Sequence, residues 1–238
     1  MCTVTYLPLE KGGFILTSNR DEQTIRKSAI PPSKYLLNNT AVFFPKDQQA
    51  GGTWIVTSHH QYTLCLLNGA YVKHERKENY KWSRGQVLLD FFHYNDVPLF
   101  IKEYDFVGIE PFTLIIVEEK ERIGLYQLVW DGENTHLEKK DAEKENIWSS
   151  VTLYEPQVIH DRKKWFDKWL EEHPLEKRNE ITDFHRFGGE GNPESNVLMN
   201  RNNIVKTVSI TSVISSQDET TMQYFDILAD QEYKIRSL

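Results

Sequence analysis

The chain has few cysteines, no long apolar run and no excess of positive charge. Its two cysteines, Cys2 and Cys65, are too sparse for a disulfide framework and lack the paired spacing of a zinc site. No apolar stretch approaches the roughly 18 to 20 residues that cross a bilayer, so we expect no membrane span. The formal net charge of -7 disfavours nucleic acid as the main ligand, because the phosphate backbone attracts basic surfaces.

A secretion signal is also missing at the start of the sequence. The segment from Met1 to Tyr6 carries neither the basic region nor the apolar region of a signal peptide. Together with the sparse cysteines, this predicts a cytoplasmic protein. The composition is otherwise that of a globular protein, with 39% hydrophobic and 26% charged residues. We expect one domain over residues 1–238, without internal repeats.

The apolar pattern predicts strands first, helices in the middle and strands again. The Gly12-Gly13 pair predicts an opening hairpin, and Pro31-Pro32 indicates a loop after it. Predicted strands cover residues 3–7, 14–18, 53–57, 62–67, 112–118, 123–130, 204–214 and 222–227. Predicted helices cover residues 83–94, with Ser83 as the N-cap, then 158–170 and 181–187.

This order of elements predicts an α+β fold with mainly antiparallel sheets, since strict βαβ alternation is scarce. Two sheets are expected, because about ten strands rarely stay in one strongly twisted open sheet. The helices would then cover the outer faces of the two sheets.

Cys2 is the residue that points most directly to chemistry. Removal of Met1, which a small second residue permits, would leave a thiol and a free α-amine on one residue. An α-amine with a pKa of about 7.7 to 8.0 can accept the thiol proton near neutral pH. Cysteine at position 2 also occurs by chance, so Cys2 needs support from other residues.

Polar residues at the ends of two predicted strands are further candidates. Asn19-Arg20-Asp21-Glu22 follows a strand whose hairpin partner begins beside Cys2. A carboxylate there could hold an α-ammonium, and an arginine could favour a thiolate. Asn68 ends another strand, where its amide could stabilise an oxyanion. The alternatives are a solvated strand end for the first motif and a turn-forming role for Asn68.

Six short motifs occur in order along the chain. They are Met1-Cys2-Thr3, Asn19-Arg20-Asp21-Glu22, Gly51-Gly52-Thr53-Trp54, Asn68, Ser83-Arg84-Gly85 and Ser149-Ser150. In this order they resemble the NRDE family, which includes the eukaryotic transport and Golgi organisation protein 2. That family is similar to the N-terminal nucleophile hydrolases, particularly the cysteine-dependent penicillin V acylase and bile salt hydrolase group. The resemblance implies a four-layer α-β-β-α sandwich.

The resemblance also implies residue roles. It makes Cys2 the nucleophile, with its own α-amine as the base, and implies hydrolysis of, or acyl transfer from, a linear carbon–nitrogen amide through an acyl-thioester. Asp21 would orient the amine, and Arg20 would support the thiolate. Asn68 would stabilise the oxyanion. One departure from the acylase pattern is that Arg20 is adjacent to Asp21 rather than three residues before it, so Asn19 is an alternative neighbour of Cys2.

A second departure concerns the usual second oxyanion asparagine and late arginine. Here the corresponding stretches offer Asn146 and Lys206. This leaves open a non-catalytic carrier of a hydrophobic ligand such as haem, a lipid or acyl-CoA, in line with the haem or lipid trafficking proposed for eukaryotic relatives. A non-enzymatic scaffold is a third alternative. The expected partner is a small-molecule amide or a hydrophobic ligand, with no resident cofactor and with the oligomeric state open.

Other features favour structural roles. His59-His60 should point to opposite faces of an extended segment, which is a poor start for a metal site. The glycine-rich loop over residues 188–196 lacks the Lys-Ser/Thr pair of a phosphate-binding loop, but it could form the rim of a pocket. Trp165, Phe166 and Trp169 have the spacing of a helical core stripe.

Overall fold

The computed structural model describes residues 3–236, which form two compact units. The terminal unit consists of residues 3–27 and 143–236, and the middle unit consists of residues 28–142. Cys2 lies outside the described residues. Within the described part of the chain, no helix has the length and apolar character needed to cross a membrane.

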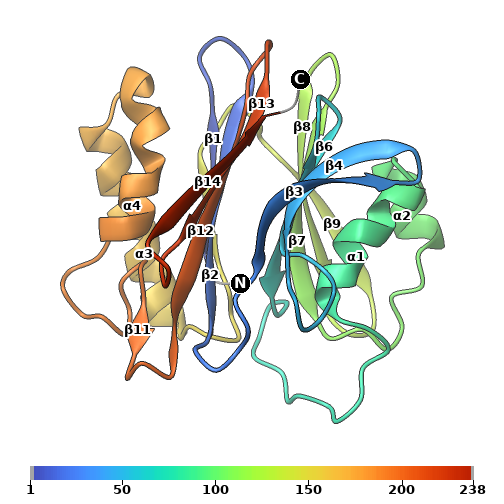
Figure 1. Cartoon of the computed structure of the whole chain (residues 1–238), viewed down its shortest axis with the longest axis horizontal. Helices are drawn as coiled ribbons and strands as arrows, with labels where there is room; N and C mark the ends of the chain where they lie inside the picture. The colour runs from blue at the N-terminus through green and yellow to red at the C-terminus, as the bar shows by residue number, and fades with distance from the viewer. Residues whose placement is uncertain (1–2, 237–238) are drawn as a thin grey trace. The chain divides into compact units, whose positions relative to one another are not determined.

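The terminal unit is built on a seven-stranded antiparallel sheet of order β10-β1-β2-β12-β13-β14, with β11 paired to β12. Its strands are β1 (Thr3–Pro8), β2 (Phe14–Gln23), β10 (Asn146–Ser149), β11 (Asn200–Arg201), β12 (Val205–Ser215), β13 (Thr220–Asp226) and β14 (Gln231–Arg236). Its helices are α3 (Pro156–Glu172), the 3-10 helix η2 (Leu175–Glu180) and α4 (Ile181–Phe187). Figure 1 shows α3 and α4 on one face of this sheet.

Local sequence explains how the terminal unit begins. The predicted β1–β2 hairpin forms, with Pro8 paired to Phe14 across the glycine turn. Gly13 has φ of +99°, and a Cβ there would lie 2.1 Å from the Ser215 carbonyl oxygen. No other residue fits such a position without a shift of the backbone. The glycine therefore allows the start of β2 to pair closely with the end of β12.

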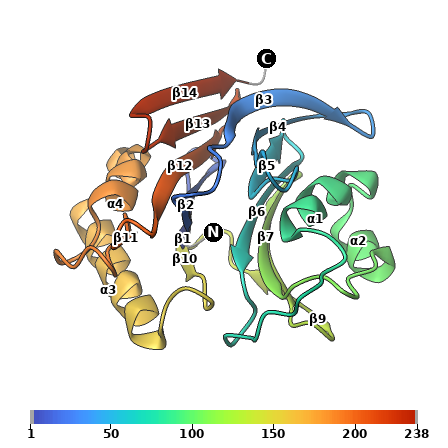
Figure 2. The same cartoon turned by 60° about the horizontal axis from the view of Figure 1, so that its bottom comes forward.

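The middle unit has its own seven-stranded antiparallel sheet, of order β3-β4-β5-β6-β7-β8-β9. Its strands are β3 (Ile30–Leu37), β4 (Thr40–Lys46), β5 (Ile55–Ser58), β6 (Tyr62–Asn68), β7 (Phe112–Glu119), β8 (Ile123–Trp130) and β9 (Thr135–Lys140). Its helices are α1 (Arg84–Asp90), the 3-10 helix η1 (Phe91–His93) and α2 (Val97–Glu103). In Figure 2, α1 and α2 lie on one face of this sheet.

An aromatic core joins the helices of the middle unit to their sheet. Phe91 and Phe100 are fully buried, with ring centroids 5.2 Å apart. Phe106 packs 5.4 Å from Phe100 and 5.6 Å from Trp130 of β8. Burial of each such side chain contributes about 1.5–3 kcal/mol, so apolar packing alone can hold these helices.

Most predicted elements are confirmed, but two expectations are wrong. Pro31 and Pro32 lie in β3 rather than in a loop; β3 is an edge strand with irregular register there, which is where a sheet tolerates proline. The single helix expected over residues 83–94 is α1 followed by η1. Ser83 does occupy the N-cap position, although its side chain makes no capping hydrogen bond among the described residues.

The sequence pattern also missed several short elements. These are β3, β4, α2, β9, β10, β11 and β14. Several of them are partly exposed; β9 and β14, for example, consist only of half-buried and exposed residues. Without a clear apolar alternation, such strands are identified only by the neighbour that pairs with them.

Candidate functional site

The start of β1 lies beside the Asn19-Arg20-Asp21 motif. Thr3 pairs with Asn19 of β2 on one side and with Ser149 of β10 on the other. Side chains alternate along β2, so Asn19 and Asp21 lie on the face that α3 and α4 cover, and Arg20 lies on the opposite face. The structure therefore brings the motif beside the first residue of β1 but divides its side chains between the two faces of the sheet.

Asn19 is fully buried and joins β2 to α4. Its side-chain amide donates to the backbone carbonyls of Val197 (2.8 Å) and His185 (3.2 Å), and its side-chain oxygen lies 2.6 Å from Nδ1 of His185. Because the Asn19 oxygen can only accept, Nδ1 of His185 carries the proton and Nε2 accepts from the Thr5 hydroxyl at 2.8 Å. Burial, together with the nearby charge of Arg162, lowers the pKa of His185 to about 3, so the ring is neutral.

Asp21 is held by two hydroxyl donors. Its carboxylate accepts a hydrogen bond from Thr207 of β12 at 2.5 Å and another from Tyr154, and the Asp21 side chain is almost fully buried. The pairing of β2 with β12 shifts between Thr207 and Ser209, which indicates a β-bulge opposite Arg20 and Asp21. A bulge re-aims the side chains on either side of it, so this irregularity helps to set the direction of the Asp21 carboxylate.

Arg162 was not predicted from the sequence, yet it connects several parts of this site. It is a fully buried residue of α3 whose guanidinium donates to Thr3 Oγ1 and to the carbonyls of Ser195 (3.1 Å) and Asn196 (2.5 Å). The same group stacks on the ring of Tyr154 at 3.7 Å. A buried cation is stable only when its donors are satisfied, and here those donors fix Thr3 at the start of β1.

Arg20 lies in a different environment from its neighbours in the motif. Its side chain is almost fully buried on the sheet face opposite α3 and α4, and Nη2 lies 3.8 Å from the Glu22 carboxylate. The Arg20 charge also acts on Tyr224 of β13, where burial raises the pKa of the phenol to about 12 and Arg20 opposes that rise. Arg20 therefore belongs to a second buried polar group on this sheet.

Asn68 and two of the remaining motifs belong to the middle unit. Asn68 ends β6, where it pairs with Phe112. Gly52 and Gly85 contact each other closely: a Cβ on Gly52 would lie 2.5 Å from the Gly85 carbonyl carbon, and Thr53 N–H donates to the Gly85 carbonyl at 3.2 Å. The Gly-Gly-Thr-Trp and Ser-Arg-Gly motifs thus meet in one backbone contact, which explains why glycine occurs in both.

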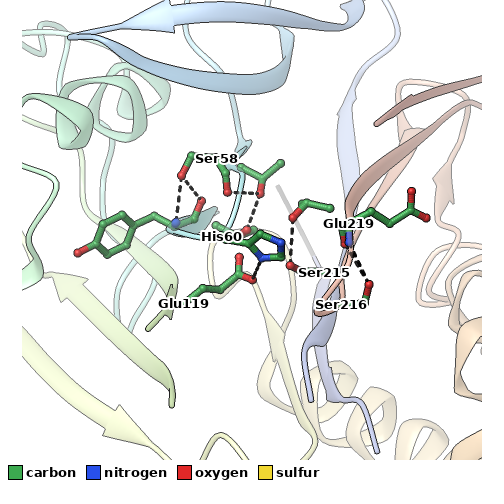
Figure 3. A network of polar contacts seen from close by, with 10 residues as sticks. Ser58, His60, Glu119, Ser215, Ser216 and Glu219 are labelled. Carbon is green, nitrogen blue, oxygen red and sulfur yellow. Dashed lines mark hydrogen bonds and ion pairs between the residues drawn. The ribbon is translucent and has the colours of Figure 1, made fainter. Parts of the chain in front are cut away.

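The His59-His60 prediction was wrong in its geometry. The pair lies in the turn between β5 and β6, where His60 has φ of +50°, and the two ring centroids are 3.9 Å apart instead of facing opposite ways. Figure 3 shows His60 turned toward Glu119, with Nδ1 3.5 Å from the carboxylate. Burial and the neighbouring His60 lower the pKa of His59. Among residues 3–236, no cluster of three or more suitable side chains could hold a metal ion.

One signal could have revealed Arg162 in the sequence. It precedes Phe166 by four residues and Trp169 by seven, so it falls within the apolar stripe of α3 rather than on the charged face. Phe166 and Trp169 are core residues as expected, whereas Phe187, the last residue of α4, is 76% exposed. A charged residue at a core position predicts a buried polar partner.

Comparison with solved structures identifies the fold. A variant of conjugated bile acid hydrolase from Clostridium perfringens matches with a TM-score of 0.55 and 11% identity, covering 98% of this chain and 92% of that chain. The Caenorhabditis elegans ortholog of N-acylethanolamine-hydrolyzing acid amidase matches with a TM-score of 0.51 and 14% identity, covering 91% and 94%. Penicillin V acylase from Agrobacterium tumefaciens matches with a TM-score of 0.51 and 9% identity, covering 99% of this chain and 86% of that chain. The predicted α+β fold of the N-terminal nucleophile hydrolases, with two mainly antiparallel sheets, is confirmed.

Sequence comparison gives the family. No curated protein matches the chain. The family described as Transport and Golgi organisation 2 matches residues 1–188, which include the Cys2 position, the Asn19 to Glu22 motif and Asn68. The resemblance to the NRDE family is therefore confirmed over most of the sequence. The chain belongs to the Transport and Golgi organisation 2 family and has the fold of the N-terminal nucleophile hydrolases.

Proposed function

We propose that the protein is an N-terminal-cysteine amidohydrolase or acyltransferase that cleaves a linear carbon–nitrogen amide bond. The observation that carries this proposal is the register of β1, which starts at Thr3 directly beside Asn19 and one residue after Cys2. Support comes from the fold, since the similar structures are named as a hydrolase, an acid amidase and an acylase.

The proposed reaction uses both functional groups of Cys2. After removal of Met1, the α-amine takes the thiol proton and the thiolate attacks the amide carbonyl carbon. Breakdown of the tetrahedral intermediate breaks the carbon–nitrogen bond, and the α-ammonium gives its proton to the leaving amine. Water then attacks the acyl-thioester, losing a proton to the α-amine, and the product acid and the thiol are released. Attack by a second amine instead of water would give acyl transfer.

We assign distinct roles to the other predicted residues. Asp21 orients the α-ammonium, and its own direction is set by Tyr154 and Thr207. Arg20, on the opposite face of β2, favours the thiolate. In this assignment Asp21 acts on the α-amine of Cys2 and Arg20 acts on its thiol, so the two faces serve two different groups of one residue. Asn68 donates to the oxyanion. Asn19 is a positioning residue, since its side chain holds α4 and the Val197 segment.

An acyl-enzyme experiment tests this function. A set of N-acyl amides of different chain length is incubated with the protein, and intact mass is recorded within seconds. We expect an added acyl group on Cys2 and release of the free amine. Cys65→Ala, which changes a fully buried cysteine, should retain the signal, and Cys2→Ala should lose it. Full turnover by Cys2→Ala would refute the mechanism.

Asn146 supports a second candidate, a non-catalytic carrier of haem, a lipid or acyl-CoA. Asn146 pairs with Tyr6 rather than with Thr3, and its amide donates to the Lys144 carbonyl at 2.9 Å. It therefore lies about 10 Å along β1 from the catalytic end, too far to complete an oxyanion site beside Cys2. One-to-one haemin binding that Cys2→Ala abolishes, in a protein with no amidase activity, would favour the carrier.

We propose the cytoplasm as the compartment of the protein. Two cysteines in 238 residues are too few for a stabilising set of disulfide bonds, so the protein does not need an oxidising compartment. The proposed N-terminal nucleophile is a thiolate, which requires the cysteine to stay reduced. A C-terminal fluorescent fusion should remain in the cytosolic fraction. Recovery of that fusion from the secretory pathway would contradict this assignment.

A further inference from the structure

A pocket opens beside the last turns of α3, on the helix layer of the terminal unit. Its volume is about 330 Å³, at the lower end of ligand pockets, and it lies between α3, α4 and the glycine-rich loop after α4. Trp165, Trp169 and Phe187 contribute aromatic rings to its lining. Phe187 is 76% exposed, so its ring is accessible to a ligand at the pocket.

The charge of the lining is negative. The lining contains three carboxylates, from Glu172, Asp183 and Glu190, one ammonium, from Lys168, and the imidazole of His173. Lys168 lies 3.9 Å from Glu172, and both side chains are more than half exposed, so this ion pair is weak. Acidic groups remain in excess beside the aromatic rings, which is the combination that attracts an organic cation.

A neighbouring pocket of the same unit provides an internal comparison. That pocket, of about 520 Å³, also has Phe187 in its lining, together with Phe225 and Arg186. The guanidinium of Arg186 covers the Phe225 ring at 4.4 Å, so the protein supplies its own cation there. Among the described residues, no guanidinium or ammonium stacks on Trp165 or Phe187.

Trp169 is 8% exposed and is restrained by His173, which also lines the pocket. The His173 ring stacks on the Trp169 indole with centroids 4.3 Å apart and an interplanar angle of 12°, and His173 Nδ1 lies 2.8 Å from the Trp169 carbonyl oxygen. A fixed indole loses little freedom when a ligand binds.

We propose that this pocket, which we call the α3–α4 pocket (lined by Trp165, Trp169, Asp183, Phe187 and Glu190), binds an organic cation of the alkylammonium class. The aromatic faces contact the charged methyl or methylene groups, and the carboxylates provide the opposite charge. This site is separate from the chemistry of Cys2, so it does not depend on the amidohydrolase proposal.

Paired ligands test the charge requirement. Choline is compared with its neutral isostere, in which carbon replaces the nitrogen, by titration followed in proton–nitrogen NMR spectra of the full chain. We expect choline to bind at least about fivefold more tightly than the isostere and to shift the amide signals of Gly188 and Gly189. Equal binding of the two compounds, or no binding of choline, would overturn the proposal.

Matched variants test the location. Asp183→Asn and Phe187→Leu should each weaken choline binding by about threefold or more, while leaving unfolding by urea almost unchanged, because both side chains are exposed. Glu232→Gln makes the same change of charge in the neighbouring pocket and should leave choline affinity unaltered. If Glu232→Gln weakens binding as much as Asp183→Asn does, the effect is one of overall charge and the α3–α4 pocket is not the site.

Discussion

The two units attach helices to a β-sheet by different kinds of contact. In each, helices cover one face of a seven-stranded antiparallel sheet. The middle unit uses apolar aromatic packing centred on Phe91, Phe100 and Trp130. The terminal unit adds to its apolar cluster a buried polar layer in which Arg162 and His185 bind strand residues by hydrogen bonds. Apolar contacts tolerate small displacements, whereas hydrogen bonds fix distance and direction.

The polar layer lies where the proposed chemistry needs fixed geometry. Thr3 and Thr5 of β1 and Asn19 and Asp21 of β2 all make side-chain hydrogen bonds on this face. Buried polar groups contribute little net stability. Their concentration at one end of the β1–β2 hairpin therefore favours a role in fixing the positions of the strand residues there. The middle unit shows that helices can be held on a comparable sheet mainly by apolar contacts, with a smaller buried polar group around Tyr62 and Glu118.

Removal of an aromatic ring from the middle unit should give the largest loss of stability. Phe100→Ala leaves a cavity in the aromatic core and should lower the free energy of unfolding by about 4 kcal/mol, measured by urea denaturation. Leu99→Ala, at a neighbouring position that is 38% exposed, should cost less than about 1 kcal/mol. Equal effects of the two changes would contradict the apolar description of this unit.

Arg162→Met should give the next largest effect. Thr3 and two backbone carbonyls lose their donor, so we expect a loss of about 3 kcal/mol in the free energy of unfolding. Lys163→Met is the matched control on the exposed face of α3, where only an ion pair with Asp167 is lost, and it should cost about 0.5 kcal/mol or less. If Arg162→Met is as mild as the control, apolar packing suffices here too.

Asn19→Ala tests the junction between β2 and α4. The carbonyls of His185 and Val197 would lose their donor, and we expect a loss of about 2 kcal/mol in thermal or urea unfolding. Asn146→Ala, in β10 of the same sheet, removes one hydrogen bond to Lys144 near the surface and should cost about 0.5 kcal/mol or less. A reversal of this order would show that Asn19 is not a positioning residue.

Acid should destabilise the protein through His185. The folded state holds the pKa of His185 near 3, below its ordinary value of 6.5, so only the unfolded chain gains this proton as pH falls between those values. The free energy of unfolding should therefore fall by about 1.4 kcal/mol per pH unit below about 6.5, and His185 contributes no dependence above that pH. His185→Gln should remove this part of the slope in urea titrations at several pH values. An unchanged slope would contradict a neutral, buried ring.

Local sequence was sufficient where one segment determined its own structure. Gly12-Gly13 required a tight turn, so the β1–β2 hairpin was predictable, and the stripe containing Phe166 and Trp169 identified α3. The sequence predicted that the Asn19 to Glu22 motif follows a strand ending at Ser18, but β2 continues to Gln23, so these four residues lie within the strand. The pairing of Asn19 with Thr3 was predictable, because the register of a hairpin follows from its turn.

Features that depend on distant partners were not predictable. Arg162 contacts Thr3 and Asn196, which lie 159 and 34 residues away, so the local sequence could indicate that it is buried in α3 but not which groups it binds. The β-bulge at Thr207 becomes visible only when β12 pairs with β2. Pro31-Pro32 suggested a loop because proline cannot donate a hydrogen bond, yet the outer edge of β3 does not require that donor.

The most direct test of the proposed chemistry is the intact mass of the purified protein before and after brief iodoacetamide treatment at neutral pH. The account predicts loss of Met1 and rapid addition of one label that maps to Cys2, while Cys65, which is fully buried, stays unlabelled. Retention of Met1, or a Cys2 that reacts no faster than an ordinary thiol, would contradict the N-terminal nucleophile and favour the carrier.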